Sequence, residues 1–414
     1  MTTNSTSTSN VRRLLILLLG GRIQPAAMTA FQLQPALVAC VVSQDTADVA
    51  DNMVDLLRRR FPDMQIAASQ AVSAIAPDAT RNAVEALIQQ YPDCAPTVSL
   101  TGAPVPMTLG AYEVARTHGI PAYYLPSNES TLLDVAGESK REQVALRLDL
   151  PDFLLVHGFH LLSPDRYPSN IPARFNQAIT HLQRDFTVAT ELLKWLTGKS
   201  MTYGLRQRGW LLGEAHRALL LQLAEAGVIK RLAWPYGRSE GTVEYQVSDA
   251  ECMKFLSGGW LEQYVYQAAH IEPPGVGILF DHMAYGLELQ SNEAQKAIGG
   301  AKQATREVDF IGLRRNAPLI ASTKTVERFW QKAYLDELVA VGNLLGGSFC
   351  TKLFVTNQPM PKGIARSERD WPLAAQQFLA HAKDAKVVVV TGETLGEIKR
   401  VLVHEAIKPT DTRK

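Results

Sequence analysis

The stretch REVDFIGLRRNAPLIASTKT, residues 306–325, holds two apolar runs joined by a polar turn. Alternating apolar residues predict that the runs form neighbouring strands, residues 307–313 and 318–324. Asp309 lies within the first run, and Lys324 closes the second. If the strands pair, these two side chains lie together where the sheet opens. A single acid and lysine on adjacent strands most often form a surface ion pair, so the surrounding sequence has to decide whether they act chemically.

The sequence around this stretch predicts an α/β domain over residues 255–414. A helix follows the Gly-Gly turn in FLSGGWLEQYVYQAAH, and GVGILFDHMAYGLELQ alternates as a strand. After Lys324 the pattern predicts a helix over residues 326–345, with Gly346 and Gly347 as its C-cap. The strand FCTKLFVT, a further helix and the strand AKVVVV complete the domain. The predicted order is helix, three strands, helix, strand, helix, strand.

The polar groups of the two strands suit phosphodiester hydrolysis. This reaction uses a hard divalent cation, Mn²⁺ or Mg²⁺, which polarises the phosphate and lowers the pKa of water, and such cations prefer carboxylate and carbonyl oxygens. Asp309 and the carbonyl oxygen of Thr323 are candidate metal ligands. Lys324 is a candidate for orienting or activating water, or for steadying the developing negative charge. The pattern is typical of a nuclease centre that contains two acids and a lysine.

The second acid must come from elsewhere, because Ser322 occupies the position two before the lysine. Glu262 is the leading candidate, since the apolar stripe of the predicted helix in WLEQYVYQ leaves it on a different face. Glu307, two residues before Asp309, points to the same side of a regular strand and is the reserve ligand. The predicted catalytic residues are Glu262, Asp309 and Lys324, and the predicted metal ligands are Glu262, Asp309 and Thr323.

The N-terminal part predicts a doubly wound α/β domain over residues 35–150. ALVACVVS, residues 36–43, is a continuous apolar run typical of a strand buried on both faces of a parallel sheet. Amphipathic helices and short strands alternate after it, as in a Rossmann-like fold. Ligands bind such sheets beyond the carboxyl ends of the strands. The predicted ligand contacts there are Ser43, Gln44 and Asp45.

Residues 151–254 predict a helical connector that ends in two strands around a Gly-rich tip, a winged-helix-like arrangement. This wing can be a spacer or can contact nucleic acid, and both interpretations stay open. Residues 1–34 are predicted to be a disordered leader, or an over-extended start with the true one near Met28, because the apolar run 14–19 is at the low end of signal-peptide length.

Composition limits the class of protein. The chain has 414 residues, 46% hydrophobic and 20% charged, as in ordinary globular proteins with two or three domains. A net charge of +1 gives no overall field that attracts a polyanion. The four cysteines are widely spaced, which argues against a disulfide framework or a zinc site and favours a reducing, cytoplasmic location. The apolar runs are too short to span a bilayer, so we expect no membrane partner.

Four segments, SGGWLEQYVY, REVDFIGL, LIASTKT and YLDELVAVGNLLGGSFCTKLFVT, together resemble the nuclease half of the CRISPR-associated Rossmann-fold (CARF) effectors, whose C-terminal domain is of the PD-(D/E)XK restriction-endonuclease type. Glu262, Asp309 and Lys324 match the family's acid, acid and lysine. The resemblance implies an N-terminal domain that forms a homodimer and binds a cyclic oligoadenylate, with tetra-adenylate first, made by type III CRISPR complexes. This allosteric activator would switch on metal-dependent cleavage of DNA, single-stranded or as nicks in duplex, and also of single-stranded RNA, in antiviral defence.

SLTGAPVPMTLGAY, residues 99–112, is similar to the Thr-Gly-rich turn of the same family. Such a turn presents backbone N–H groups and a helix N-terminus to a phosphate. The residues APV at 103–105 stand where the family has Gly, Thr and Lys, which removes a donor, a hydroxyl and a charge. A different cyclic nucleotide, or a changed phosphate contact, is consistent with these substitutions. On this resemblance the predicted ligand contacts also include Thr101, Gly102 and Met107.

A non-enzymatic interpretation also stays open. In it the third domain is a degenerate nuclease, and the protein is a regulator that responds to a cyclic nucleotide or a nucleic-acid-binding protein helped by the wing. Ser322 favours this alternative, because a serine cannot replace the charge of a carboxylate.

Overall fold

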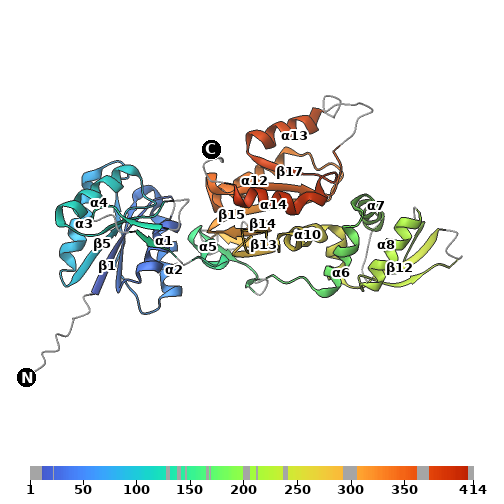
Figure 1. Ribbon diagram of the computed structural model, residues 1–414, viewed down its shortest axis with the longest axis horizontal. Helices are drawn as coiled ribbons and strands as arrows, with labels where there is room; N and C mark the ends of the chain where they lie inside the picture. Colours follow the sequence, from blue (N-terminus) through green and yellow to red (C-terminus); the bar gives the residue numbers. More distant parts are fainter. Residues whose placement is uncertain are drawn as a thin grey trace, which may run out of the picture. The chain divides into compact units, whose positions relative to one another are not determined.

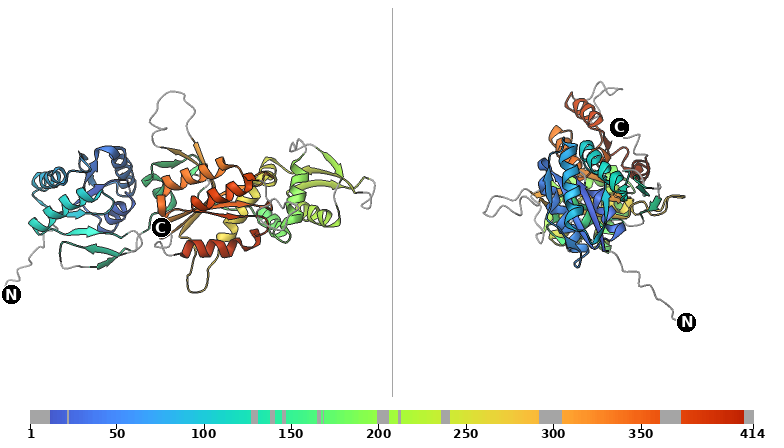
Figure 2. Two further views of the ribbon diagram at one scale, coloured as in Figure 1. Left: turned by 90° about the horizontal axis from the view of Figure 1, so that it is seen from above. Right: turned by 90° about the vertical axis from the view of Figure 1, so that its left-hand side faces the viewer.

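The structure of the protein is a computed structural model, shown as ribbons in Figures 1 and 2. It describes residues 12–21, 23–126, 131–137, 141–144, 147–164, 167, 169–198, 206–210, 213–235, 241–291, 305–360 and 373–408. These residues divide into two compact units, one of residues up to 160 together with Ser291, and one of the other residues from 161 onward. Both units mix helices with a sheet, which confirms the predicted α/β class.

The first unit is a Rossmann-like sheet with helices on both faces (Figure 1). Its strand order is β3-β2-β1-β5-β6-β7-β8, and β4 also pairs with β2. The pairs from β3 to β6 are parallel. The strands are β1 (Arg12–Leu19), β2 (Leu37–Ser43), β3 (Gln65–Ile66), β4 (Gln70–Val72), β5 (Cys94–Ser99), β6 (Ala122–Tyr124), β7 (Thr131–Asp134) and β8 (Arg141–Gln143). The helices are α1 (Gln24–Leu33), α2 (Ala47–Arg60), α3 (Pro77–Gln90), α4 (Val105–His118) and α5 (Leu150–Val156).

The predicted disordered leader is wrong for residues 12–33. These residues form β1 and α1, and β1 is a central strand of the sheet, between β2 and β5. Every residue from Leu14 to Leu19 has no exposed surface. The run is continuously apolar because both faces of this strand are covered, and not because it is a signal sequence. A start near Met28 would remove this central strand.

The predicted domain boundary at residue 150 comes about ten residues too early. Helix α5 belongs to the first unit, and its Asp152 is fully buried. Asp152 forms an ion pair with Arg60 of α2, and Arg59 Nε lies 3.6 Å from its carboxylate. Burial raises the pKa of Asp152, and the two arginines oppose that rise. A buried carboxylate needs such partners, so α5 is tied to α2.

The second unit is built on a mixed sheet. Its strands after residue 281 have the order β17-β16-β15-β14-β13. The pairs β13–β14 and β14–β15 are antiparallel, and β15–β16 and β16–β17 are parallel. The strands are β13 (His282–Ser291), β14 (Thr305–Arg314), β15 (Ala317–Lys324), β16 (Thr351–Thr356) and β17 (Val387–Val390). The helices are α10 (Trp260–Ala269), α12 (Lys332–Leu345), α13 (Leu373–Asp384) and α14 (Ile398–Ile407). Helices α10 and α14 share one buried cluster with β14, β15 and β16.

The connector has the predicted helices and wing, with one strand more than expected. Its sheet has the order β10-β12-β11. Its elements are α6 (Ala173–Leu182), α7 (Phe186–Thr197), β10 (Gln207–Trp210), α8 (Glu214–Glu225), β11 (Ile229–Ala233) and β12 (Thr242–Val247). Asp185 accepts hydrogen bonds from the backbone of Thr187 and Val188 as the N-cap of α7, so α6 and α7 are separate helices.

The connector and the domain after residue 254 share one hydrophobic core, so the boundary predicted there is not a structural division. Phe175 of α6 stacks on Phe255, with ring centroids 4.6 Å apart and planes at 4°. The chain runs through α9 (Ala250–Lys254) and a π-helical turn (Phe255–Gly259) directly into α10. Within the described ranges, no helix combines the length and the apolar character that crossing a bilayer requires.

Candidate active site

Asp309 lies within β14, between β13 and β15. Its neighbour Phe310 belongs to the core that α10 covers, so the strand pleat directs Asp309 to the opposite face, towards α12. Asp309 is only 8% exposed, and its Oδ2 accepts a hydrogen bond of 2.6 Å from the backbone N–H of Thr323. Burial raises the pKa of Asp309, and the ammonium of Lys324 and this hydrogen bond oppose the rise.

Lys324 ends β15 on the same face as Asp309, as the sequence predicted. Its side chain is half-buried, and its Nζ lies 5.3 Å from the centroid of the Tyr334 ring of α12, a cation–π contact. The side-chain amide of Gln358 donates a hydrogen bond of 2.8 Å to the carbonyl oxygen of Thr325, which fixes the strand end. Glu307, Asp309, Ser322, Lys324 and Glu337 are the polar residues of a cavity of about 120 Å³.

Glu262, on the first turn of α10, is half-buried and electrostatically coupled to these residues. Its pKa is raised to about 8, first by burial, then by the like charges of Asp309 and Glu307, while Lys254 and Lys324 lower it. Its Oε2 lies 3.1 Å from where a Cβ on Gly286 would be.

Glu262 and Asp309 border different cavities. Glu262 lines one of about 370 Å³ together with Lys254, Gln263 and Tyr285, and Asp309 lines the smaller one. In the pairing of β13 with β14, Tyr285 is opposite Phe310 and Leu287 is opposite Val308. Gly286, between them, is therefore opposite Asp309. The Glu262 carboxylate therefore lies against Gly286 of β13, and the charge of Asp309 contributes to its raised pKa.

The donor set of this site is all oxygen, which fits Mn²⁺ or Mg²⁺ better than zinc. The predicted ligands are two carboxylates, Glu262 and Asp309, and the backbone oxygen of Thr323. Glu307, the alternative ligand, is exposed and lines the cavity of Asp309. Among the described residues, no group of three or more His, Cys, Asp and Glu side chains is arranged to hold a metal ion. A cation here would depend on the backbone oxygen and on water or phosphate for the rest of its coordination.

We expect Gly286→Ala to weaken Mn²⁺ binding about tenfold and to lower the free energy of unfolding by about 1 kcal/mol. Gly286 has φ +59, which disfavours a side chain, and a Cβ there would meet the Glu262 carboxylate. Isothermal titration calorimetry and urea unfolding measure the two effects. Gly275→Ala is the matched control, because Gly275 has φ +75 but nothing within 4 Å of the added Cβ. An equal loss of Mn²⁺ affinity in both variants would contradict the placement of Glu262.

Three residues around the site, Gly286, Tyr334 and Glu337, were not predicted from the sequence. Glu337 of α12 lines the smaller cavity and raises the pKa of Asp309. A signal existed only for Gly286, because an isolated glycine within a strand pattern indicates close approach of another group. Tyr334 and Glu337 follow the lysine on the next helix, and nothing in their spacing distinguishes them from other residues on its surface.

The predicted ligand contacts of the first unit lie at the carboxyl edge of its sheet, with one exception. Ser43 ends β2, is 2% exposed, and shares a hydrogen bond with the Thr46 hydroxyl, while Gln44 and Asp45 are exposed. Met107 is fully buried in the core under the sheet, so its side chain supports the turn and is not presented to a ligand. Thr101 and Gly102 follow β5 after one intervening residue, Leu100.

The Thr-Gly turn is held by its own contacts. Thr101 Oγ1 accepts a hydrogen bond of 2.6 Å from the backbone N–H of Leu125, which ties the turn to the end of β6. Gly102 has φ +100, a conformation that favours glycine. The hydroxyl of Thr101 is therefore engaged in fixing the turn, and the exposed groups nearby are the better ligand contacts.

Gly20 and Gly21 follow β1 directly and lie in the segment that was predicted to be a disordered leader. A Cβ on Gly20 would lie 2.7 Å from the carbonyl oxygen of Gly102, so the two turns touch. The sheet order reverses between β1 and β5, since β2 follows β1 on one side and β6 follows β5 on the other. Open α/β sheets bind ligands at this switch point. The sequence LLILLLGG, residues 14–21, already has the pattern of an apolar strand followed by a glycine turn.

Comparisons with known proteins place the fold. No family model matches the sequence, and no curated protein matches it. Can2 from Sulfobacillus thermosulfidooxidans, solved in complex with cyclic tetra-adenylate, is 16% identical, with a TM-score of 0.69 over 95% of this chain and 99% of its own. Protein VC1899 from Vibrio cholerae is 17% identical, with a TM-score of 0.72 over 95% and 97%.

A type III CRISPR defence DNA nuclease activated by cyclic oligoadenylate is 16% identical, with a TM-score of 0.51. The match covers 89% of this chain and 52% of that one, so the chain spans about half of that nuclease. The chain therefore has the fold of Can2 and VC1899 along almost its whole length.

Proposed function

We propose that the protein is a CARF effector of type III CRISPR defence, a metal-dependent endonuclease activated by a cyclic oligoadenylate. The observation that supports the proposal is that the buried Asp309 and Lys324 line one cavity of the second sheet, and that the charge of Asp309 contributes to the raised pKa of Glu262. Groups with such perturbed pKa values beside a cavity are typical of active sites. The shared fold of Can2, solved with cyclic tetra-adenylate, supports the ligand class.

In this proposal the residues after 254 act as a PD-(D/E)XK nuclease. Glu262, Asp309 and the carbonyl oxygen of Thr323 hold a divalent cation, which when bound polarises the phosphate and lowers the pKa of water. The N–H of Thr323 keeps the Asp309 carboxylate oriented. Lys324, held over the Tyr334 ring, steadies the negative charge that develops on the phosphate.

The first unit is the proposed sensor. Ser43, Gln44, Asp45 and the turns after β1 and β5 meet the activator at the carboxyl edge of the sheet. We propose a homodimer, because a cyclic, symmetric ligand on a two-fold axis contacts both copies alike. Exposed Val105 and Leu109, one turn apart on α4, offer apolar surface for self-association. A ligand that binds one arrangement of the dimer more tightly shifts the population towards it.

We propose that the protein acts in the cytoplasm. All four cysteines are free thiols, and Cys40, Cys252 and Cys350 are buried. Free cysteines in the core are usual in a reducing compartment.

The test is a cleavage assay with the purified full chain, plasmid DNA, single-stranded DNA and single-stranded RNA. Each substrate is incubated with Mn²⁺ or Mg²⁺, with and without cyclic tetra-adenylate or hexa-adenylate. We expect metal-dependent nicking of the plasmid and cleavage of single-stranded DNA, stimulated about tenfold or more by the activator. Cleavage that is independent of both metal and activator would contradict the proposal.

Ser322 favours a second candidate, a regulator that binds the cyclic nucleotide without cleaving. Ser322 lines the cavity of Asp309 and Lys324 at the position where a third carboxylate would complete the site. Tight binding of a cyclic oligoadenylate with no cleavage of any substrate would support this candidate.

A further inference from the structure

Trp210, the last residue of β10, is 66% exposed although it is held in place. Its indole lies against Gly241, and a Cβ added to Gly241 would come 2.9 Å from the ring atom Cε2. Gly241 has φ +73, so the position favours glycine for its backbone as well. The ring thus rests on bare backbone, and most of its surface stays open to solvent. A large aromatic ring fixed in this way can stack on a flat ligand with little loss of side-chain entropy.

The three-stranded sheet of the connector has a buried face and an outer face. Val243, Tyr245 and Val247 of β12 are buried against the helices. Arg208 pairs with Glu244 and Trp210 with Thr242 in the register, so the pleat places these residues on the outer face. The wing strands of this sheet can be followed in Figure 2.

The outer face is basic. Arg206 Nη1 lies 3.2 Å from the Glu244 carboxylate, and Lys230 of β11 stands opposite Gln246. Among the described side chains of this face, Arg206, Arg208 and Lys230 carry positive charge and Glu244 carries negative charge. The excess of cations on the face that carries the open indole complements a chain of phosphates with unpaired bases.

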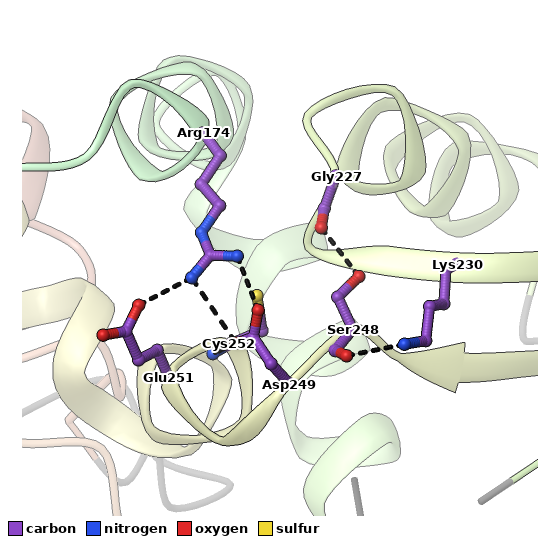
Figure 3. Close-up of polar contacts among 7 residues, drawn as sticks. All are labelled: Arg174, Gly227, Lys230, Ser248, Asp249, Glu251 and Cys252. Carbon is purple, nitrogen blue, oxygen red and sulfur yellow. Dashed lines mark hydrogen bonds and ion pairs between the residues drawn. The ribbon is translucent and has the colours of Figure 1, made fainter. Parts of the chain in front are cut away.

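Polar contacts fix the base of the sheet to the segment that leads into α9 (Figure 3). Lys230 Nζ donates to the carbonyl oxygen of Ser248 at 2.7 Å, and Ser248 Oγ donates to Gly227 at 2.7 Å. Arg174 of α6 forms ion pairs with Asp249 at 2.6 Å and Glu251 at 2.7 Å, at the start of α9. Helix α9 continues through the π-helical turn into α10. A strand held on this sheet would therefore be held at a fixed position relative to α10.

We propose that the outer face of the β10-β12-β11 sheet binds single-stranded nucleic acid. Trp210 stacks on an unpaired base, and Arg206 and Arg208 on the same strand end face the phosphates. The inference rests on the proposed function in that it names where the substrate strand is held. Any base can stack on an aromatic ring, so the site distinguishes single-stranded from double-stranded nucleic acid and has no sequence preference. A paired duplex offers no free base face to Trp210.

The test is fluorescence anisotropy with the full chain, a labelled oligothymidylate of about 20 nucleotides and a duplex of the same length. EDTA is present, so no metal-dependent cleavage occurs. We expect Trp210→Ala to weaken binding of the single strand about tenfold and to leave duplex binding unchanged, while Trp210→Phe loses about twofold. Arg208→Gln should weaken binding and lower the slope of log affinity against log salt by about 1.

Two variants of the same unit serve as controls. Leu373→Ala removes a side chain that is 69% exposed on α13, and Arg400→Gln removes an exposed charge on α14. Both should bind like the wild type. If Trp210→Ala lowers the melting temperature, its loss of binding could come from unfolding. The affinities of Trp210→Phe and Arg208→Gln then test the proposal.

Wild-type affinity in the Trp210→Ala and Arg208→Gln variants, or no binding of the single strand by the wild type, overturns the proposal. Because binding is measured without metal, it is independent of the cleavage assay. A chain that binds the strand without cleaving it would keep this inference and remove the nuclease proposal. If the wild type cleaves and these variants keep wild-type affinity for the single strand, the nuclease proposal is kept and this inference is removed.

Discussion

Asp309→Asn and Lys324→Ala are each expected to reduce activator-stimulated cleavage of single-stranded DNA by about a thousandfold or more. Asp309→Asn removes the buried charge that would hold the cation, and Lys324→Ala removes the ammonium that faces the same cavity. Initial rates with Mn²⁺ and saturating cyclic tetra-adenylate measure the effect. Affinity for the activator should not change, because the proposed ligand edge belongs to the other unit.

Asp384→Asn and Lys383→Ala are the matched controls for this pair. Both residues are exposed at the end of α13, so the same chemical changes occur in the same unit without a buried site. They should cleave at the wild-type rate. A rate within tenfold of the wild type in either Asp309→Asn or Lys324→Ala would mean that the hydrolysis takes place elsewhere in the protein.

Glu262→Gln is expected to make the metal-free protein more stable, by an amount that grows with pH. The pKa of Glu262 is raised from 4.5 to about 8 in the folded state, so between these values the folded state binds a proton that the unfolded state has lost. The stability of the wild type therefore falls as pH rises through this range. Since one pKa unit corresponds to about 1.4 kcal/mol, the full rise sets an upper bound of roughly 5 kcal/mol. A glutamine side chain at this position stays neutral and avoids this cost.

Urea unfolding in EDTA from about pH 5 to pH 9 measures the difference between the two proteins. We expect it to reach a few kcal/mol above pH 8 and to be small near pH 5. Glu272→Gln, at an exposed position in the loop after α10, should show no such trend. A constant difference across the pH range would show that Glu262 is charged in the folded protein throughout, and the coupling to Asp309 would then be wrong.

The sequence predicted the elements that carry the candidate site because their patterns are local. Alternating apolar residues gave β14 and β15 to within two residues at each end. The helical stripe around Trp260 placed Glu262 off the core face, and the charges of Asp309 and Glu307 contribute to its raised pKa. The start of α12 was predicted six residues early, because residues 326–331 carry no breaker that marks them as a turn.

What the sequence could not predict depends on partners that are distant along the chain. The run Leu14–Leu19 reads as a signal core as readily as a strand, and only its pairing with β2 and β5 decides between the two. Met107 was assigned to the ligand by resemblance, but packing under the sheet buries it. Whether α9 and α10 begin a new domain depends on the shared core, which no local pattern encodes.

The place of β1 in its sheet has a consequence for synthesis on the ribosome. Six fully buried apolar residues, Leu14 to Leu19, leave the ribosome before either neighbouring strand has been made. The second neighbour, β5, is complete only at Ser99, some 80 residues later. At 5–20 residues per second this delay is about 4 to 16 s. During that time at least one edge of this hydrophobic strand stays unpaired, so chaperone binding or aggregation should centre on this segment.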